Sequence, residues 1–437
     1  MGLNKFKMVL GGTATLMASL LATSTSAYSV AKSDLAIGRM DGWFEVNRDI
    51  WETRTVVGVR DYQKDYETLT DFADALVAHG ERQGEEGFAL LQNERNALPL
   101  AQGAHVTLFG NNCYNMPNGH TGVNANNNNT NYYKKQITLL EGLQATQRVT
   151  INDTVVAGDF TGRMAKAPSY ASYTIPEKFT EKDTWVIPSN SIGIVAVGRG
   201  GGEGSTYKPD TANGASDPLA LSADELNMID YARSHCDKVV VLVVSANAME
   251  LGPIAKGGAH AVDAIGFCAI PNDYSYGGIA KVLTGLADAT GGLTDTYLYN
   301  NSFNPATINM GQQVYEDASS IAMTAETDPY GRNNPNFRAN NYIVEAEGIY
   351  VGYKYYETRY FDSMVDPNGT KATDPIGSTD VGQAWNYSKE VLFPFGTGLT
   401  YVPYEQEVLR VNMDVSENGK TNAVVKVTNK GIIYAQI

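Results

Sequence analysis

Four continuous apolar runs, separated by segments of helical pattern, constrain the fold of this chain more than any other feature. The runs are Val106–Gly110, Ile192–Gly198, Lys238–Val244 and Val262–Phe267. Unbroken apolar runs are typical of strands that are covered on both faces, as in parallel sheets. Helices are predicted over 133–147, 222–235 and 277–286, and a Ser-x-x-Glu capping box opens the second. This alternation predicts an α/β sandwich with a parallel or mixed sheet.

The segment before this region has two parts. Residues 1–27 resemble a secretory signal peptide, with Lys5 and Lys7 ahead of the uncharged stretch Met8–Ala22 and small residues at 25–27. The stretch is about 15 residues, short of the roughly 20 that span a bilayer. We therefore expect a secreted or extracytoplasmic protein, membrane-anchored only if the signal stays uncleaved. Residues 28–84 are predicted to be a helical lead-in, with a helix over 62–79 that stops at Gly80.

The pattern changes again after residue 404. Val408–Met413 and Ala423–Thr428 are predicted strands, and Asn418-Gly419 between them is a strong hairpin signal. Two strands cannot bury a core by themselves. Residues 405–437 therefore predict an incomplete β-sandwich domain behind the α/β sandwich of residues 85–404.

Composition narrows the classes of function. The 33 Lys and Arg against 48 Asp and Glu give a net charge of −15, which argues against nucleic-acid binding. The three cysteines and five histidines show no metal-ligand or disulfide spacing, so we expect no cofactor and no metal. The 26 tyrosines suit sugar-binding loops, or they simply fill strands and surface loops.

The strongest candidate for chemistry is the glycine-rich segment Gly198–Gly204, directly after an apolar run. Ligands gather where parallel strands deliver loops at their carboxyl ends. This loop offers one carboxylate, Glu203, and one guanidinium, Arg199, as the candidate catalytic and substrate-binding groups. A dinucleotide fingerprint is disfavoured because Glu203 occupies the position of its third glycine. A structural glycine turn with a solvated Glu203 remains open.

Six ordered segments resemble the second, α/β-sandwich domain of glycoside hydrolase family 3. They are Leu90–Glu94 with Leu98–Leu100, Arg199–Glu203, Leu219–Ser222, Ser245–Leu251, Glu347–Tyr356 and Phe393–Tyr401. The resemblance implies a flavodoxin-like α/β sandwich with a mixed sheet, and residues after 404 resemble the start of a fibronectin type III-like domain. Departures lie at 118–126, 204–210 and 288–296, where the usual family segments are altered.

The resemblance implies a retaining, β-glucosidase-like hydrolase. That mechanism uses two carboxyl groups about 5–5.5 Å apart. Carried over by motif, Glu203 is the general acid/base, whereas the family's nucleophilic Asp sits on a separate (β/α)8 barrel of about 250 residues. We find no such barrel here, so we expect half of an enzyme, inactive alone.

The expected partners are a β-glucoside or oligosaccharide and a separate barrel domain. Two alternatives stay open: a non-catalytic carbohydrate-binding or scaffold module, and a fragment that folds poorly because its last strands leave a sheet edge exposed.

Overall fold

The computed structural model of the protein describes a defined part of the chain. These residues are 66, 68–115, 136–160, 179–199, 219–309, 313–314, 316, 341–342, 344–345, 347–366, 382–412, 420 and 422–431. The chain divides into two units, 1–67 and 68–437, and every element named below lies in the second. The predicted signal peptide, Glu203 and the Asn418-Gly419 turn lie outside the described residues.

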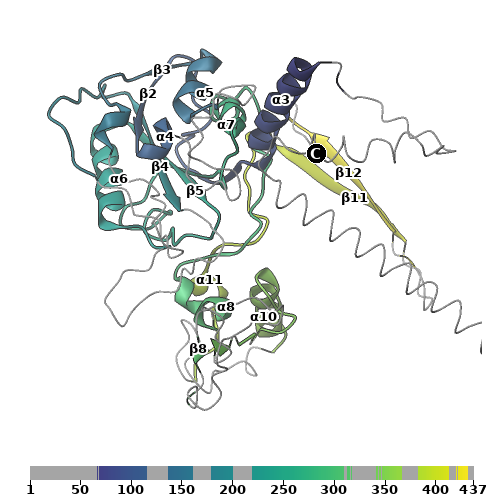
Figure 1. The fold of residues 1–437 in the computed structure, drawn as a ribbon. Helices are drawn as coiled ribbons and strands as arrows, with labels where there is room; N and C mark the ends of the chain where they lie inside the picture. The colour runs from purple at the N-terminus through teal and green to yellow at the C-terminus, as the bar shows by residue number, and fades with distance from the viewer. Residues whose placement is uncertain are drawn as a thin grey trace, which may run out of the picture. The chain divides into compact units, whose positions relative to one another are not determined.

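A six-stranded mixed sheet forms the centre of the second unit, in the order β1-β6-β5-β4-β2-β3 (Figure 1). Its strands are β1 (Ala89–Asn93), β2 (Ala104–Phe109), β3 (Val149–Ile151), β4 (Ile192–Arg199), β5 (Lys238–Ser245) and β6 (Ala264–Phe267). Neighbouring strands from β2 to β6 are parallel, and the edge strand β1 is antiparallel to β6. All four apolar runs are strands, so the predicted α/β fold with a mixed sheet is confirmed.

The strand order reverses direction between β2 and β4. The chain runs outward from β2 to β3, and then returns past β2 to lay down β4, β5 and β6 on the other side. This is the flavodoxin-like order, in which ligands bind in the crevice at the carboxyl ends of the two strands that flank the reversal. Here those ends are Phe109 of β2 and Arg199 of β4. Gly198 and Arg199, the first residues of the glycine-rich segment, therefore lie at the topological switch point.

Helices cover both faces of the sheet. They include α5 (Leu139–Thr146), α6 (Ala223–His235) and α7 (Ser275–Leu283). Alternate residues of β4 enter two separate cores: Ile194 and Ala196 pack with α5 and α7, whereas Val195 and Val197 pack with α6. Because side chains alternate along a strand, a strand buried on both faces must be apolar at every position.

The predicted capping box of α6 is confirmed: Ser222 Oγ accepts from the Glu225 N–H, and the Glu225 carboxylate accepts from the Ser222 N–H. Such reciprocal bonds satisfy amides that have no partner inside the helix. Helix α5 begins in the same way at Thr138, which pairs with Glu141.

The lead-in helix differs from its prediction. Helix α3 spans Leu69–Gly87 and passes through Gly80, so the predicted stop there is wrong. Gly80 and Gly84 lie where α3 approaches the start of α7, and a Cβ at Gly84 would overlap the Ser275 carbonyl oxygen. These glycines allow close helix packing instead of ending the helix. Lys281 of α7 adds ion pairs to Glu81 and Glu85 of α3, both at 2.8 Å.

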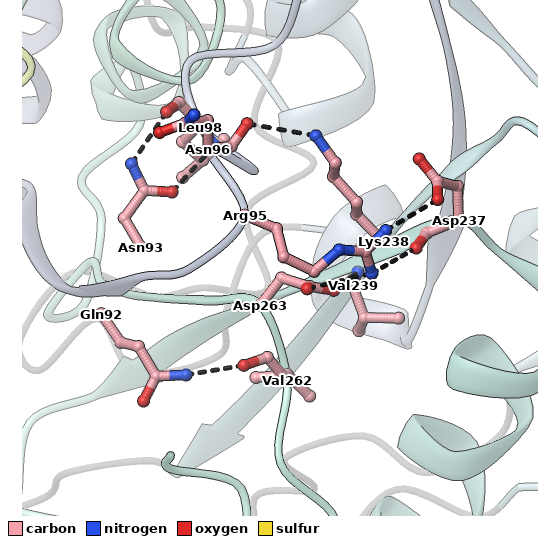
Figure 2. A network of polar contacts seen from close by, with 10 residues as sticks. All are labelled: Gln92, Asn93, Arg95, Asn96, Leu98, Asp237, Lys238, Val239, Val262 and Asp263. Carbon is pink, nitrogen blue, oxygen red and sulfur yellow. Dashed lines mark hydrogen bonds and ion pairs between the residues drawn. The ribbon is translucent and has the colours of Figure 1, made fainter.

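The segment after β1 forms a polar bracket at the amino-terminal edge of β5 and β6 (Figure 2). Asn93 Nδ2 donates to the Leu98 carbonyl (2.8 Å), and the Leu98 N–H donates to Asn93 Oδ1 (3.0 Å). Arg95, which has a positive φ of 53°, reaches Asp237 at 2.8 Å and Asp263 at 3.3 Å. This motif therefore holds the sheet edge opposite the glycine-rich segment.

The described residues form further helices and strands outside the central sheet. They are α4 (Asn111–Tyr114), η1 (Ala157–Asp159), η3 (Asn301–Phe303), α8 (Pro305–Asn309), α10 (Tyr353–Val365), α11 (Tyr387–Glu390), β7 (Tyr297–Leu298), β8 (Gln313–Val314), β9 (Asn341–Tyr342), β10 (Val391–Phe393), β11 (Tyr404–Asn412) and β12 (Asn422–Asn429). Strands β7 and β10 pair antiparallel, as do β8 and β9.

The two strands predicted after residue 404 are confirmed as the antiparallel pair β11–β12, with Val408 opposite Val425. Whether this pair opens a β-sandwich domain stays a prediction. No helix among the described ranges is long and apolar enough to cross a membrane.

From the packing of α3 on α7 we predict opposite effects on stability for alanine substitutions at two glycines of α3. We expect Gly84→Ala to lower the free energy of unfolding by about 1–3 kcal/mol, because the new methyl group overlaps the Ser275 carbonyl. Gly87→Ala is the matched control, because a Cβ there meets nothing within 4 Å. It should be neutral or stabilise by up to about 1 kcal/mol. Urea unfolding followed by circular dichroism measures both, and equal midpoints would contradict this packing.

Candidate functional site

The carboxyl end of β4 holds a fully buried ion pair between Arg199 and Glu225 of α6. Arg199 Nη1 donates to Glu225 Oε1 at 2.6 Å, and Nη2 donates to Oε2 at 2.8 Å. The same two nitrogens also donate to the carbonyl oxygens of Gly198 (2.8 Å) and Ala220 (2.7 Å). A planar guanidinium suits such two-point pairing with a carboxylate. All four of these hydrogen bonds join Arg199 to other groups of this chain.

The Glu225 carboxylate serves two purposes at once. Its Oε2 atom accepts from Arg199 and also from the Ser222 N–H at 2.8 Å, so the ion pair and the helix cap share one group. Arg199 ends β4, and Ala220, Ser222 and Glu225 lie where the described chain resumes before and in α6. The pair therefore ties together both ends of segment 200–218, which contains Glu203.

A second motif fixes the same edge of the sheet. Ser245, the last residue of β5, lies beside Arg199 in the β4–β5 register, and its Oγ donates to the Asn247 carbonyl at 2.7 Å. The Glu250 N–H donates to the Leu219 carbonyl at 3.0 Å. Segments 219–222 and 245–251 are two of those whose sequences resemble family 3. They surround Gly198 and Arg199, where the glycine-rich segment begins.

Asn112 of α4, the helix that follows β2, lies close to Gly198 at the end of β4. A Cβ on Gly198 would lie 2.5 Å from Asn112 Nδ2 and 3.1 Å from the Val244 carbonyl oxygen. Position 198 therefore has to be glycine for the Asn112 amide to lie there, a steric reason separate from backbone flexibility. The Tyr276 hydroxyl donates to the Asn112 carbonyl at 3.2 Å and holds that backbone in place.

The predicted site residues have different outcomes. Glu203 lies outside the described residues, so its role stays a prediction. Arg199 is at the switch point, but its guanidinium is engaged by Glu225, Gly198 and Ala220. Its direct contact with a substrate stays a prediction.

Sequence reasoning missed two residues of this edge. Glu225 was recognised only as a capping residue, because nothing in a linear pattern indicates that a buried arginine shares its carboxylate. Asn112 falls at the start of an Asn-rich stretch whose composition suggests a loop and gives no reason to select one asparagine.

Burial disfavours nucleophilic chemistry at two of the three thiols. None of the three cysteines, all of which lie in described residues, forms a disulfide, and two of them are buried, as expected for small apolar side chains. Burial raises the pKa of the Cys236 thiol to about 12 and also raises that of Cys268. A thiol with a raised pKa is protonated at neutral pH and is a poor nucleophile. Within the described ranges, no group of three or more His, Cys, Asp or Glu side chains is arranged to hold a metal ion.

The chain matches one protein family over most of its length. The family model of the glycosyl hydrolase family 3 C-terminal domain matches residues 88–401. Beta-glucosidase A of Butyrivibrio fibrisolvens is 26% identical over 392 residues, which covers 80% of this chain and 39% of that protein. Thermostable beta-glucosidase B of Acetivibrio thermocellus is 23% identical over 214 residues, covering 49% and 20%. The chain thus spans well under half of either curated relative.

Solved structures share the fold. A beta-glucosidase from Paenibacillus barengoltzii superposes with a TM-score of 0.54 at 22% identity, covering 82% of this chain and 33% of that one. Beta-glucosidase 3B from Thermotoga neapolitana, solved with glucose, gives a TM-score of 0.54 at 20% identity, covering 83% and 42%.

The buried ion pair predicts a large and asymmetric cost of mutation. We expect Arg199→Met to lower the free energy of unfolding by about 3–5 kcal/mol, because it leaves the buried Glu225 carboxylate without its cation. Arg233→Met is the control, because Arg233 pairs with Asp230 at the surface, where both side chains are over a third exposed. That change should cost about 1 kcal/mol or less. Denaturant unfolding measures both, and similar costs would contradict the pairing described here.

Proposed function

Because the chain belongs to glycosyl hydrolase family 3 through its α/β-sandwich domain, we propose that it is the half of a retaining, β-glucosidase-like hydrolase that supplies the general acid/base, Glu203. The observation that supports this proposal is the position of the strand end from which segment 200–218 departs. The segment that contains Glu203 leaves the carboxyl end of β4 at the topological switch point, and the Arg199–Glu225 pair holds both of its ends. Ligand sites of open α/β sheets occur at this position.

The role assigned to Glu203 requires it to give up a proton in the first step of the reaction and to accept one in the second. In a retaining mechanism one carboxylic acid protonates the leaving oxygen while a second carboxylate attacks the anomeric carbon. The first group, now ionised, then removes a proton from the water that releases the sugar. We assign both of these proton transfers to Glu203 and the attack to an aspartate on a separate barrel domain. Arg199 supports Glu203 by fixing the strand end that precedes it.

The substrate class follows from the relatives. Both curated relatives are named as beta-glucosidases, and the Thermotoga neapolitana enzyme was solved with glucose. We therefore propose β-glucosides, including gluco-oligosaccharides, as the substrates of the assembled enzyme. The signal pattern of residues 1–27 supports a secreted or extracytoplasmic location for this activity.

The assignment of Glu203 predicts a specific kinetic defect. The chain would be combined with a family 3 barrel domain and assayed on an aryl β-glucoside that has a good leaving group. We expect Glu203→Ala to lower kcat by about 10²–10⁴-fold, because the water that releases the sugar loses its base. Azide, which needs no base, should restore turnover and yield a glucosyl azide. Glu407→Ala, in the exposed strand β11, is the control and should leave kcat unchanged.

Unchanged turnover of Glu203→Ala, both without and with azide, would contradict the assignment. Calorimetry on the full chain alone tests the alternative of a non-catalytic carbohydrate-binding module. Heat of binding with gluco-oligosaccharides, together with an inactive assembled pair, would favour that module over an enzyme half.

A further inference from the structure

A pocket of about 300 Å³ lies between helix α3 and the loop that follows β6. Gln83 and Gly87 of α3 line one wall, and residues 268–272 line the other. The loop begins at the carboxyl end of β6, at the same edge of the sheet as the end of β4. Ligands of open α/β sheets bind beyond the carboxyl ends of the strands, and small-molecule sites have volumes of about 300–1,000 Å³. The pocket therefore has the position and the size of a site for a small ligand.

The loop wall of this pocket contains backbone groups that have no partner in the described part of the chain. The Cys268 N–H still donates to the Val243 carbonyl at 2.9 Å, but no hydrogen bond among the described residues involves the backbone of Ala269 or Ile270. Ala269 also has a positive φ of 51°, which is uncommon for a residue other than glycine. Backbone outliers of this kind cluster at active sites and ligand clamps. The loop thus offers two N–H donors and two carbonyl acceptors to a ligand.

The side chains that line the pocket are uncharged. Asn272 Nδ2 donates to Gln83 Oε1 at 2.6 Å, so the amides of the two walls meet, and Gln83 Nε2 makes no hydrogen bond among the described residues. Ile270 and Pro271 add apolar surface. Burial raises the pKa of the Cys268 thiol, so this group too is neutral at physiological pH. A charged ligand would lose its hydration here without meeting an opposite charge, which disfavours it.

We propose that this pocket is an accessory binding site for a neutral sugar of one or two pyranose rings. A hydroxyl group both donates and accepts, so a pyranose can pair with the backbone of Ala269 and Ile270 and with the amide of Gln83. Its C–H surface can pack on Pro271. Neighbouring strands are about 4.8 Å apart, so this site lies about 10 Å along the sheet edge from the end of β4, with β5 between them. Binding here needs neither Glu203 nor a barrel domain.

The test titrates the full chain with glucose and with cellobiose, followed by calorimetry and by NMR of isoleucine methyl groups. We expect the Ile270 methyl signal to shift as either sugar is added. The signal of Ile229, which is fully buried in the core under α6, should not move. Glucuronate, which carries a carboxylate in place of a hydroxymethyl group, should bind about tenfold more weakly than glucose, because no lining side chain is a cation.

Substitutions in α3 test the location of the site. A Cβ at Gly87 meets nothing within 4 Å, so Gly87→Leu can fill the pocket without displacing the backbone, and it should raise Kd for glucose about tenfold. Ala78→Leu, at an exposed position of the same helix that does not line the pocket, is the matched control and should leave Kd unchanged.

A second variant removes a hydrogen-bonding group instead of filling space. Gln83→Ala should raise Kd about threefold to tenfold, because one hydrogen bond between uncharged groups is lost. Gln83 is exposed at the surface of α3, so this variant serves if Gly87→Leu does not fold. Thermal unfolding of each variant establishes which of them are folded.

Three results would overturn the proposal. They are a wild-type chain that binds neither sugar, an Ile270 signal that stays in place while sugar binds, and a wild-type Kd in folded Gly87→Leu, or in Gln83→Ala if Gly87→Leu does not fold. Glucuronate binding as tightly as glucose would contradict a site for neutral sugars. None of these results bears on Glu203, because its assignment is judged by turnover of the assembled enzyme.

Discussion

Strand β4 pairs with β2 on one side and with β5 on the other, and this double pairing determines where the rest of the unit can be built. Val195 lies opposite both Phe109 of β2 and Val241 of β5, so the registers of three strands are set together. Side chains alternate along β4 into two cores, one under α5 and α7 and one under α6. A one-residue slip would exchange these two sets and place every methyl group in the wrong core.

The end of the same strand shows why a buried ion pair can be useful although it contributes little net stability. Removing two charges from water costs about as much as their attraction returns, so apolar replacements are often as stable. The arrangement of Arg199 and Glu225 instead specifies a geometry, because the guanidinium also binds two backbone carbonyls on either side of the segment it joins. The alternative conformations of this strand end would leave a charge buried and unpaired.

Local signals predicted much of the fold, and contacts between distant residues account for what they missed. The apolar runs and the Ser222 capping box depend on neighbouring residues alone, and the structure confirms them. Gly80 was expected to end a helix. That prediction was wrong because the sequence cannot show that the start of α7 packs against this glycine. Likewise, the glycine-rich segment was found from its position after a strand, whereas the pairing of Arg199 with Glu225 joins residues 26 apart and needed the structure.

The two ends of the family 3 domain meet at one edge of the sheet. The Leu399 N–H donates to the Leu90 carbonyl at 2.7 Å, and the two residues form an antiparallel bridge. Nearby, the buried Asp288 carboxylate accepts from the Tyr401 N–H at 2.7 Å and from the Thr400 hydroxyl. Since entry and exit lie together, a neighbouring domain can be fused before or after this one without threading through its core. Because its two ends are adjacent, the domain can be moved as a unit to another position in a gene during evolution without any change to its fold.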